Sequence, residues 1–179
     1  MNSERFEIRK SKYQDLDKVL NLYRKVSKVA GGLARTEKEI TKKYIKYIFD
    51  KSQECGIQFV IVDKLQTDII VAEIHCYKLA PAVFSHIFSD LTIAVDKKYQ
   101  DEGLGTMLFK TLLHYITENR KDIYRVELIA RESNKRAIHL YEKLGFKIEG
   151  RLDNRIKTNE NSFEADIPMA WFNPNFIKE

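Results

Sequence analysis

Residues 91–119 read LTIAVDKKYQDEGLGTMLFKTLLHYITEN, and this stretch decides how the rest of the chain is interpreted. Its first five residues, Leu91–Val95, are apolar and partly β-branched, which predicts a short buried strand. From Leu104 to Ile116 a leucine or isoleucine returns every fourth residue, which predicts an amphipathic helix. The expected local order is strand, a turn that carries two glycines, and helix.

The turn itself, QDEGLG at residues 100–105, has a chemical use. The first N–H groups of a helix lack intrahelical partners, and the helix dipole adds partial positive charge there. Glycines let a ligand approach the backbone closely, so the turn predicts an anion site, typically for phosphate. The alternative is a plain connection whose glycines serve only the turn. The pattern is neither a Walker A loop nor the three-glycine dinucleotide fingerprint.

A second stretch repeats the strand-then-helix arrangement. Val126–Ala130 is another strand candidate, and Ser133 and Asn134 offer side chains that can cap a helix start. The segment from Lys135 to Leu144 predicts a helix, which Gly145 ends in the usual C-terminal position.

One face of this second helix presents an amide, a small residue and a phenol, at Asn134, Ala137 and Tyr141. With these residues the chain resembles the GNAT superfamily of Gcn5-related N-acetyltransferases. The signature Gln/Arg-x-x-Gly-x-Gly/Ala stands here as Gln100, Gly103 and Gly105. The later signature Asn-x-x-Ala-x-x-x-Tyr-x-x-x-Gly-Phe stands as Asn134, Ala137, Tyr141, Gly145 and Phe146.

The predicted fold is α+β, in one domain over residues 1–179. The resemblance implies the acyl-CoA N-acyltransferase fold, with a mixed, mostly antiparallel central sheet of about seven strands and about four flanking helices. The expected order is β-α-α-β-β-β-α-β-α-β-β. A capping box at Thr36–Glu39 predicts a helix that carries Ile40, Tyr44, Tyr47 and Ile48 on one face. The remaining strands are expected at Phe6–Arg9, Gln58–Val62, Ile69–Tyr77, Phe146–Leu152 and Phe163–Phe172, with polar loops at Gln66–Asp68 and Asn154–Asn161.

Composition limits the class of protein. The 179 residues are 44% hydrophobic and 32% charged, and no run reaches the roughly 18 apolar residues that span a bilayer, so no membrane partner is expected. The net charge of +5 fits an anionic ligand such as coenzyme A or, alternatively, nucleic acid. The basic residues are spread along the chain, so nucleic acid is not expected.

The N-terminus is charged and has no apolar signal core, which predicts a cytoplasmic location. Cys55 and Cys76 are expected as free thiols.

The resemblance implies that acetyl-CoA is the cosubstrate, that no metal is needed, and that an amine attacks directly in a ternary complex. The pyrophosphate is then expected on the backbone N–H groups of Gln100, Asp101, Glu102, Gly103, Leu104, Gly105 and Thr106. The pantetheine arm is expected along the main chain of Ile93, Ala94 and Val95, where a backbone N–H can polarise the thioester carbonyl. Asn134 and Ala137 are expected to face the same cofactor, and Asn134 can serve as a simple helix cap at the same time.

Tyr141 matches the family's general acid, which protonates the leaving thiolate. A phenol has a pKa of about 10 and a thiol about 8.5, so the phenol keeps its proton at neutral pH. The alternative is a core tyrosine with a bonded hydroxyl. The attacking amine must lose a proton, and Asp90 is the expected base, although Ser89 occupies the closer family position. Glu73 and a water chain are the alternatives.

The acceptor is expected to be a primary amine of a small molecule, an amino acid or a peptide. In the family, two loops form its pocket, here about Val29–Arg35 and Leu152–Phe163, with charged residues at Arg35, Asp153, Arg155 and Glu160. A homodimer is possible. The rival functions are a non-catalytic acyl-CoA sensor or partner protein, and a nucleic-acid binder with salt-steep affinity.

Overall fold

The computed structural model of the protein describes residues 5–29, 32–66, 69–159 and 161–178. The chain forms two compact units, one of Met1–Tyr77 with Thr92–Leu113 and one of Lys78–Leu91 with His114–Glu179. We call these the first and second units. The chain passes between them three times, so neither unit is one continuous stretch of sequence.

The strands of the first unit are buried on both faces. β1 (Phe6–Lys10) pairs antiparallel with β2 (Gly56–Asp63), and β2 pairs antiparallel with β3 (Ile70–Lys78). Seven of the eight residues of β2 and eight of the nine residues of β3 are buried. Strands that are apolar on both faces need cover on both sides, and helices supply it here.

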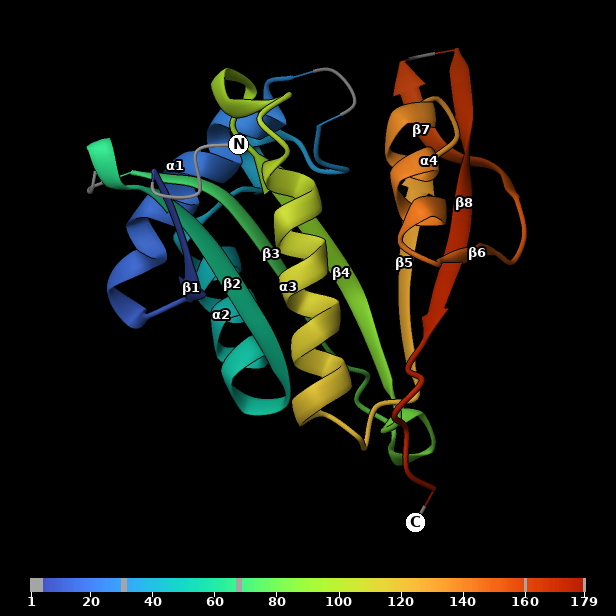
Figure 1. The fold of residues 1–179 in the computed structure, drawn as a ribbon. Helices are drawn as coiled ribbons and strands as arrows, with labels where there is room; N and C mark the ends of the chain where they lie inside the picture. The colour runs from blue at the N-terminus through green and yellow to red at the C-terminus, as the bar shows by residue number, and fades with distance from the viewer. Residues whose placement is uncertain (1–4, 30–31, 67–68, 160, 179) are drawn as a thin grey trace. The chain divides into compact units, whose positions relative to one another are not determined.

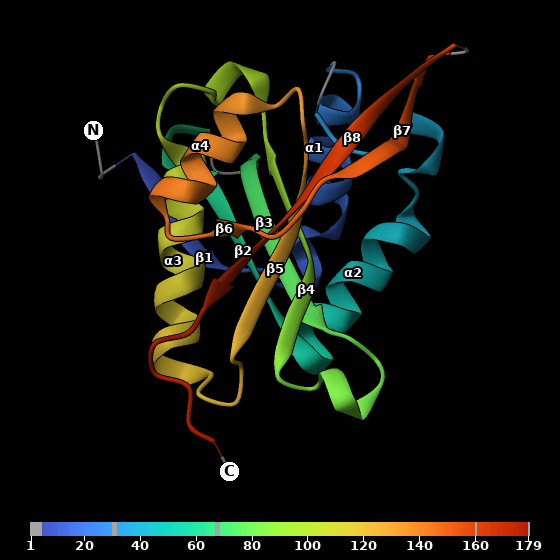
Figure 2. The ribbon, with the colours of Figure 1, turned by 90° about the vertical axis from the view of Figure 1, so that its right-hand side faces the viewer.

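Figures 1 and 2 show α1 (Leu16–Ser27) and α2 (Lys42–Cys55) on one face of these strands and α3 (Leu104–Asn119) on the other. The core on the first face joins α1 and α2 to β2 and β3, and its fully buried members include Leu22, Tyr23, Ile45 and Ile48. On α3 the residues at fourfold spacing, Leu104, Leu108, Leu112 and Ile116, are all at most 1% exposed. The apolar stripe predicted from the sequence is therefore the buried face of this helix.

The second unit contains the start of β4 (Ile87–Val95) and four further strands. β4 pairs parallel with β5 (Arg125–Arg131) at Ile87–Arg125 and Phe88–Val126, and β5 pairs antiparallel with β8 (Ser162–Phe172). β8 also pairs with β6 (Lys147–Ile148) and β7 (Leu152–Asn159). Buried and more exposed residues alternate along β5 and most of β8, and α4 (Lys135–Lys143) covers one face of them (Figures 1 and 2).

The predicted fold class is confirmed. Hydrogen bonding links the strands in the order β1-β2-β3-β4-β5-β8-β6, with β7 on β8, so the described residues form eight strands where about seven were expected. They also form four α-helices. The sheet is mixed and mostly antiparallel, as predicted.

The prediction of a polar loop at Asn154–Asn161 is wrong. Leu152–Asn159 is the strand β7, which pairs antiparallel with β8, and the expected strand at Phe146–Leu152 shrinks to the two residues of β6. The side chains of β7 are largely exposed, so the apolar alternation that signals a half-buried strand is absent from its sequence.

The capping box at Thr36 does not start the long helix, as was expected. The Glu39 carboxylate accepts hydrogen bonds from the N–H and hydroxyl of Thr36, both at 2.7 Å, but this closes only the short turn Glu37–Glu39. Ile40 leaves helical geometry, and α2 begins after Thr41, whose hydroxyl oxygen accepts the N–H of Tyr44 at 3.1 Å. Of the expected turn at residues 66–68, Thr67 and Asp68 lie outside the described residues.

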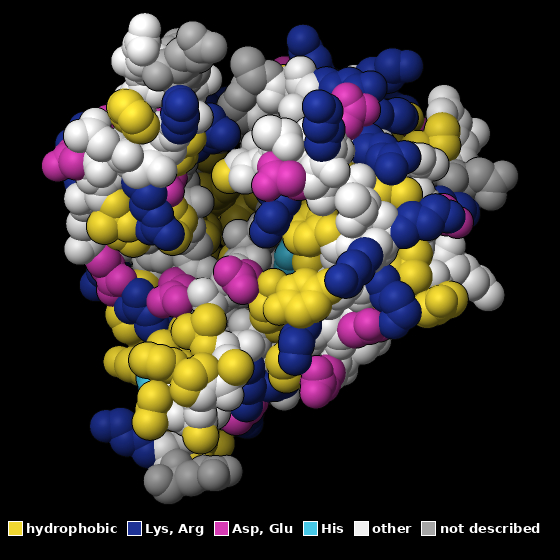
Figure 3. Space-filling model, turned by 180° about the vertical axis from the view of Figure 1, so that it is seen from behind, with side chains coloured by type: hydrophobic (Ala, Val, Ile, Leu, Met, Phe, Trp, Pro, Cys, Tyr) yellow, Lys and Arg dark blue, Asp and Glu magenta, His cyan; other side chains and the backbone are white. Residues whose placement is uncertain are grey.

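Hydrophobic side chains gather around the C-terminal segment, at the lower left of Figure 3. Tyr124 is 42% exposed, and its ring lies 5.3 Å from that of Phe172 and 4.9 Å from that of Phe176. Within the described part of the chain, no helix combines the length and apolar character required to cross a bilayer.

Candidate active site

The connection from β4 to α3 is anchored at its beginning. The N–H of Asp96 donates to the carbonyl of Val71 at 2.9 Å. The Asp96 carboxylate accepts the N–H of Lys98 at 3.0 Å and the ammonium of Lys25 at 3.2 Å. This carboxylate therefore caps the short 3₁₀ turn Lys97–Tyr99 and fixes it to the first unit.

The next residues bend the backbone sharply. Asp101 and Gly103 have φ values of +72° and +77°, and Glu102 between them is not in the positive-φ region. Backbone whose φ alternates in sign turns successive N–H groups toward one side, which makes a concave site for an anion. The carbonyl of Gly103 accepts the N–H of Met107 at 3.0 Å, which is the first hydrogen bond of α3.

The N–H groups at the start of α3 are open to a ligand. In the described part of the chain, no hydrogen-bond partner is recorded for the backbone N–H groups of residues 102–106. Five N–H groups in sequence, at the positive end of a helix dipole, are suited to bind phosphate oxygens.

Gly105 has no role in the fold that requires a glycine. An added Cβ would meet only the Cδ1 of Ile93, at 3.7 Å, which is ordinary van der Waals contact. Alanine at a helical position is favoured over glycine by about 1 kcal/mol. Glycine here instead leaves space beside the open N–H groups, which is the shape that a closely approaching ligand needs. Gly103, by contrast, is explained by its positive φ.

The other predicted cofactor-binding residues of the first unit fall into a buried group and a more exposed group. Ala94 is 1% exposed and Leu104 is 1% exposed, so their side chains belong to the core and only their main chain can serve a ligand. Ile93 and Val95 are partly exposed at the end of β4. Gln100 and Asp101 are exposed, while Glu102 and Thr106 are partly exposed.

In the second unit, the start of α4 is closed by the protein's own side chains. The side-chain oxygen of Asn134 accepts the N–H of Ala137 at 3.2 Å, so Asn134 caps the helix as expected. The N–H of Ser133 donates to the carboxylate of Glu164 at 2.7 Å. Ala137 is partly exposed and lies in the first turn of α4.

Tyr141 lies in the last turn of α4, two residues before the helix ends at Lys143, and is 9% exposed. Burial raises the pKa of its phenol from the usual 10 to about 12. Its ring centroid lies 6.0 Å from that of Phe146, whose N–H donates to the carbonyl of Tyr141 at 3.0 Å. Gly145, with φ of +95°, turns the chain so that Phe146 packs back onto the helix.

The two carboxylates proposed as bases have opposite environments. Asp90 is exposed and has a φ of +50° within β4, which marks a local irregularity in the strand. Glu73 is fully buried, and its carboxylate accepts hydrogen bonds from Tyr23 at 2.6 Å and Gln58 at 2.7 Å and contacts His75 Nδ1 at 2.9 Å. Glu73 is thus a core residue, which argues against direct contact with an amine.

The residues expected around the acceptor form contacts within the protein. The guanidinium of Arg35 lies 4.3 Å from the centre of the Tyr44 ring. Asp153 is paired with Arg151, and Arg155 lies 3.5 Å from Asp166. Burial raises the pKa of the Asp166 carboxyl. Glu160 lies outside the described residues.

The sequence did not indicate that Arg5 belongs to this region. Its guanidinium lies 3.5 Å from Glu102, a residue 97 positions away that belongs to the connection before α3. No local pattern signals such a contact. No cluster of three or more potential metal ligands occurs among the described residues.

Comparison with known proteins identifies the family. The model of the acetyltransferase (GNAT) family matches residues 28–146, about two thirds of the chain. Spermidine N(1)-acetyltransferase from Escherichia coli K12 is 28% identical over 142 residues, which cover 79% of this chain and 70% of that protein.

Two solved structures are similar in fold. A GCN5-related N-acetyltransferase from Kribbella flavida has a TM-score of 0.80 at 18% identity, over 94% of this chain and 98% of that one. Spermidine N-acetyltransferase from Vibrio cholerae, solved with CoA and spermine, has a TM-score of 0.76 at 17% identity, over 97% and 98%. With the glycine-bearing start of α3 and this family match, the chain belongs to the GNAT family of acetyltransferase enzymes.

Proposed function

We propose that this protein transfers the acetyl group of acetyl-CoA to a primary amine, by direct attack in a ternary complex. The observation that carries the proposal is the open start of α3, where the backbone N–H groups of residues 102–106 have no recorded partner in the described chain. An open helix start of this kind suits the diphosphate of coenzyme A.

The residues of the first unit fit acetyl-CoA. The open N–H groups match phosphate oxygens, and the space beside Gly105 lets them be approached. The main chain of Ile93, Ala94 and Val95, at the end of β4, is assigned to align the pantetheine arm. When bound, acetyl-CoA supplies an activated acetyl thioester, and the residues of the chain orient it.

Tyr141 is assigned as the general acid. Its raised pKa of about 12 means that the phenol holds its proton at every pH at which the enzyme would work. A group that stays protonated can donate a hydrogen bond to the sulfur as negative charge develops on it. Burial also keeps water away from this hydroxyl, which strengthens the hydrogen bonds that it makes.

The amine must be neutral when it attacks. An amine with a lysine-like pKa of about 10.4 is neutral in roughly one molecule in a few thousand at pH 7. Asp90, which is exposed, is assigned to accept or relay this proton, with water as the alternative carrier.

The substrate class that we favour is an aliphatic polyamine or a related small amine. The Escherichia coli relative bears the name spermidine N(1)-acetyltransferase, and a Bacillus subtilis relative bears the name spermine/spermidine N(1)-acetyltransferase. The second of these is 39% identical over 59 residues, which cover 33% of this chain and 38% of that protein.

The test has two steps. Thermal unfolding is first measured with and without millimolar acetyl-CoA, and a ligand at 100 to 1,000 times its dissociation constant adds about 3–4 kcal/mol of stability. Release of free thiol is then followed with acetyl-CoA and a panel of spermidine, spermine, simple diamines, amino acids and a peptide N-terminus. Absence of any thermal shift would overturn the proposal. A shift without turnover on any amine would favour a non-catalytic acyl-CoA sensor.

A further inference from the structure

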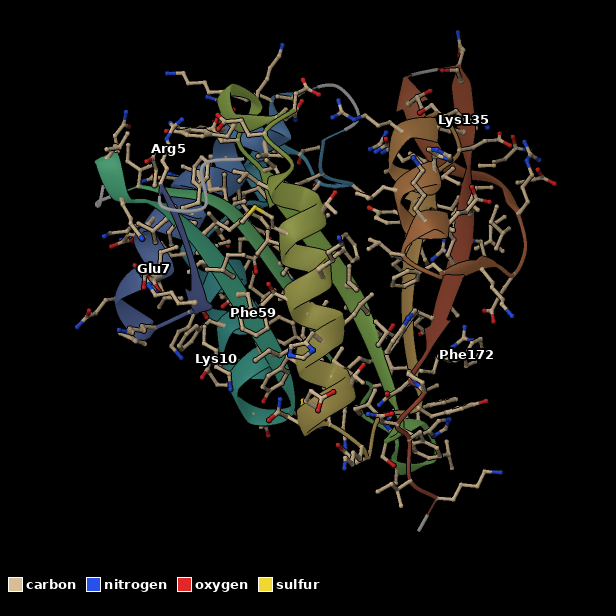
Figure 4. The ribbon with its side chains drawn as sticks, viewed as in Figure 1. Arg5, Glu7, Lys10, Phe59, Lys135 and Phe172 are labelled. Carbon is tan, nitrogen blue, oxygen red and sulfur yellow. The ribbon has the colours of Figure 1, made fainter. Side chains whose placement is uncertain are left out.

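Arg5 forms a contact that the proposed mechanism does not use. Figure 4 labels it at the beginning of β1, with Glu7 and Lys10 further along the same strand. Its guanidinium donates to the Asp63 carboxylate at 2.7 and 3.1 Å and lies 3.5 Å from the Glu102 carboxylate. Arg5 therefore links the end of β2 to the connection that precedes α3.

The same guanidinium also borders an aromatic residue of this connection. It lies 5.6 Å from the ring centre of Tyr99 and 4.9 Å from that of Phe6. Tyr99 is 7% exposed, and its hydroxyl interacts with the Asp63 carboxylate, while burial raises the pKa of the phenol. Arg5, Asp63, Tyr99 and Glu102 thus form one cluster within the first unit, which we call the Arg5 cluster.

The location of Glu102 creates an electrostatic problem for a phosphate ligand. Glu102 directly precedes Gly103, and its backbone N–H is the first of the five open groups. A free carboxylate at this place would repel the diphosphate of coenzyme A, because like charges at close range destabilise each other. Asp63 shares the same arginine, and its side chain is fully buried beside it.

We propose that Arg5 is a positioning residue for coenzyme A: it holds the connection before α3 and offsets part of the negative charge of Glu102, so that the open N–H groups accept a diphosphate. The inference rests on the proposed function, because it concerns the same anion site. Arg5 acts here through Glu102 and the backbone, and no direct contact with the cofactor is needed.

The test is a double-mutant cycle read by isothermal titration with CoA. We expect Arg5→Gln to weaken binding about tenfold, which is about 1.4 kcal/mol. Glu102→Gln should bind as well as the parent or up to about threefold more tightly, by about 0.6 kcal/mol. Arg5→Gln with Glu102→Gln should return to within about twofold of Glu102→Gln alone, because the carboxylate beside the open N–H groups is gone. Simple addition of the two single effects would overturn the proposal.

Truncated ligands show which part of the cofactor is affected by the loss of Arg5. CoA and dephospho-CoA share the diphosphate and should lose the same factor in Arg5→Gln. A loss confined to CoA would place the effect at the 3′-phosphate and overturn the inference. Acetyl-pantetheine lacks the nucleotide, so its kcat/KM should be the same in Arg5→Gln and the parent. A parallel loss with this substrate would indicate a general structural defect and would also overturn it.

Arg9 provides the matched control. It lies on β1, and its guanidinium donates to the Asp15 carboxylate at 2.7 and 2.8 Å, as Arg5 does to Asp63. Arg9→Gln should leave CoA binding unchanged. If Arg5→Gln alone does not fold, the cycle is run with Asp63→Asn added to every variant, which removes the buried charge. If the parent protein itself fails to bind CoA, the proposed function fails, whereas binding that ignores Arg5 rejects only this inference.

Discussion

The two strand-to-helix connections of the chain begin their helices in opposite ways. At α4, the side chain of Asn134 caps the first turn, and the Glu164 carboxylate accepts the N–H of Ser133. At α3, the N–H groups of residues 102–106 have no recorded partner among the described residues. A helix start that the protein closes with its own side chains serves the fold. One that it leaves open, with glycines beside it, is available to a ligand.

The connection from β4 to α3 also contains a carboxylate that could cap a helix, but this carboxylate caps an earlier turn. Asp96 accepts the N–H of Lys98 and so caps the short turn Lys97–Tyr99, eight residues before α3 begins at Leu104. The second connection has the reverse arrangement: its helix start is capped by the protein's own side chains, and the residue that we propose as the acid, Tyr141, comes later in the helix. The comparison therefore agrees with the proposal, in which the first connection binds the cofactor and the helix after the second donates a proton.

Replacing Tyr141 gives the largest expected effect, because it removes the proposed proton donor and leaves the open helix start intact. Tyr141→Phe should lower kcat by about 10²–10⁴-fold, the usual contribution of a general acid, with the affinity for acetyl-CoA within about twofold of the parent. Steady-state kinetics and isothermal titration measure the two quantities. Tyr124→Phe, at a 42% exposed tyrosine of the same unit, is the control and should change neither.

The pH profile sharpens this assignment. Burial raises the pKa of Tyr141, so its proton is retained below about 12 and is lost only as the pH approaches that value. Between pH 7 and 10, kcat/KM for the amine should therefore rise as the amine loses its proton, without a fall caused by the phenol. A fall centred near pH 10, present in the parent and absent in Tyr141→Phe, would contradict the buried environment. Retention of more than half of kcat in Tyr141→Phe would reject the acid role.

Gly105→Ala tests the open helix start directly. Its Cβ fits the protein, so stability should stay equal or rise by up to about 1 kcal/mol. Affinity for CoA should nevertheless fall about tenfold, or about 1.4 kcal/mol, because the methyl group occupies the space that the ligand needs. Thermal unfolding and isothermal titration separate the two effects. Gly150→Ala is the matched control, since its Cβ would meet only Pro168 at 3.8 Å. Unchanged CoA affinity in both variants would show that Gly105 does not leave space for the ligand.

Gly145 offers the contrasting case, a glycine that the fold itself requires. Its φ is +95°, so Gly145→Ala should destabilise the protein by about 1 kcal/mol through backbone strain, with CoA affinity unchanged. Gly145→Asn should lose less, because asparagine tolerates positive φ better than alanine. Thermal unfolding measures both. Equal losses in the two variants would point to the nearby Trp171 ring, 3.4 Å from the added Cβ, in place of the backbone.

The sequence predicted well the elements whose burial follows a simple period. The start of α3 at Leu104 and the strand around Val126–Ala130 were found because their apolar residues recur at helical or strand spacing and end at recognisable turns. The capped start of α4 at Asn134 was predicted from its capping side chain and the helical spacing that follows it. Local patterns of amino acids are therefore sufficient to locate both connections of the candidate site.

The sequence could not predict features that depend on distant pairing. β7 is a polar strand held by its hydrogen bonds to β8, so its side chains carry no apolar alternation. Glu73 looked available in the sequence, but its partners Tyr23 and Gln58 come from two other elements and bury it. The contact of Arg5 with Glu102 spans 97 residues, and no local rule signals such a pair.

The smallest expected effect concerns the cap of α4. Asn134→Ala should destabilise the protein by about 0.5–1 kcal/mol, because the N–H of Ala137 loses its acceptor. For a chain of this size that corresponds to a fall in melting temperature of roughly 2–4 °C per kcal/mol. Asn134→Ser keeps a capping oxygen and should restore most of the stability. CoA affinity in Asn134→Ser then decides the comparison: an unchanged value means that this helix start is purely structural, whereas a weaker one means that the same amide serves both the fold and the cofactor.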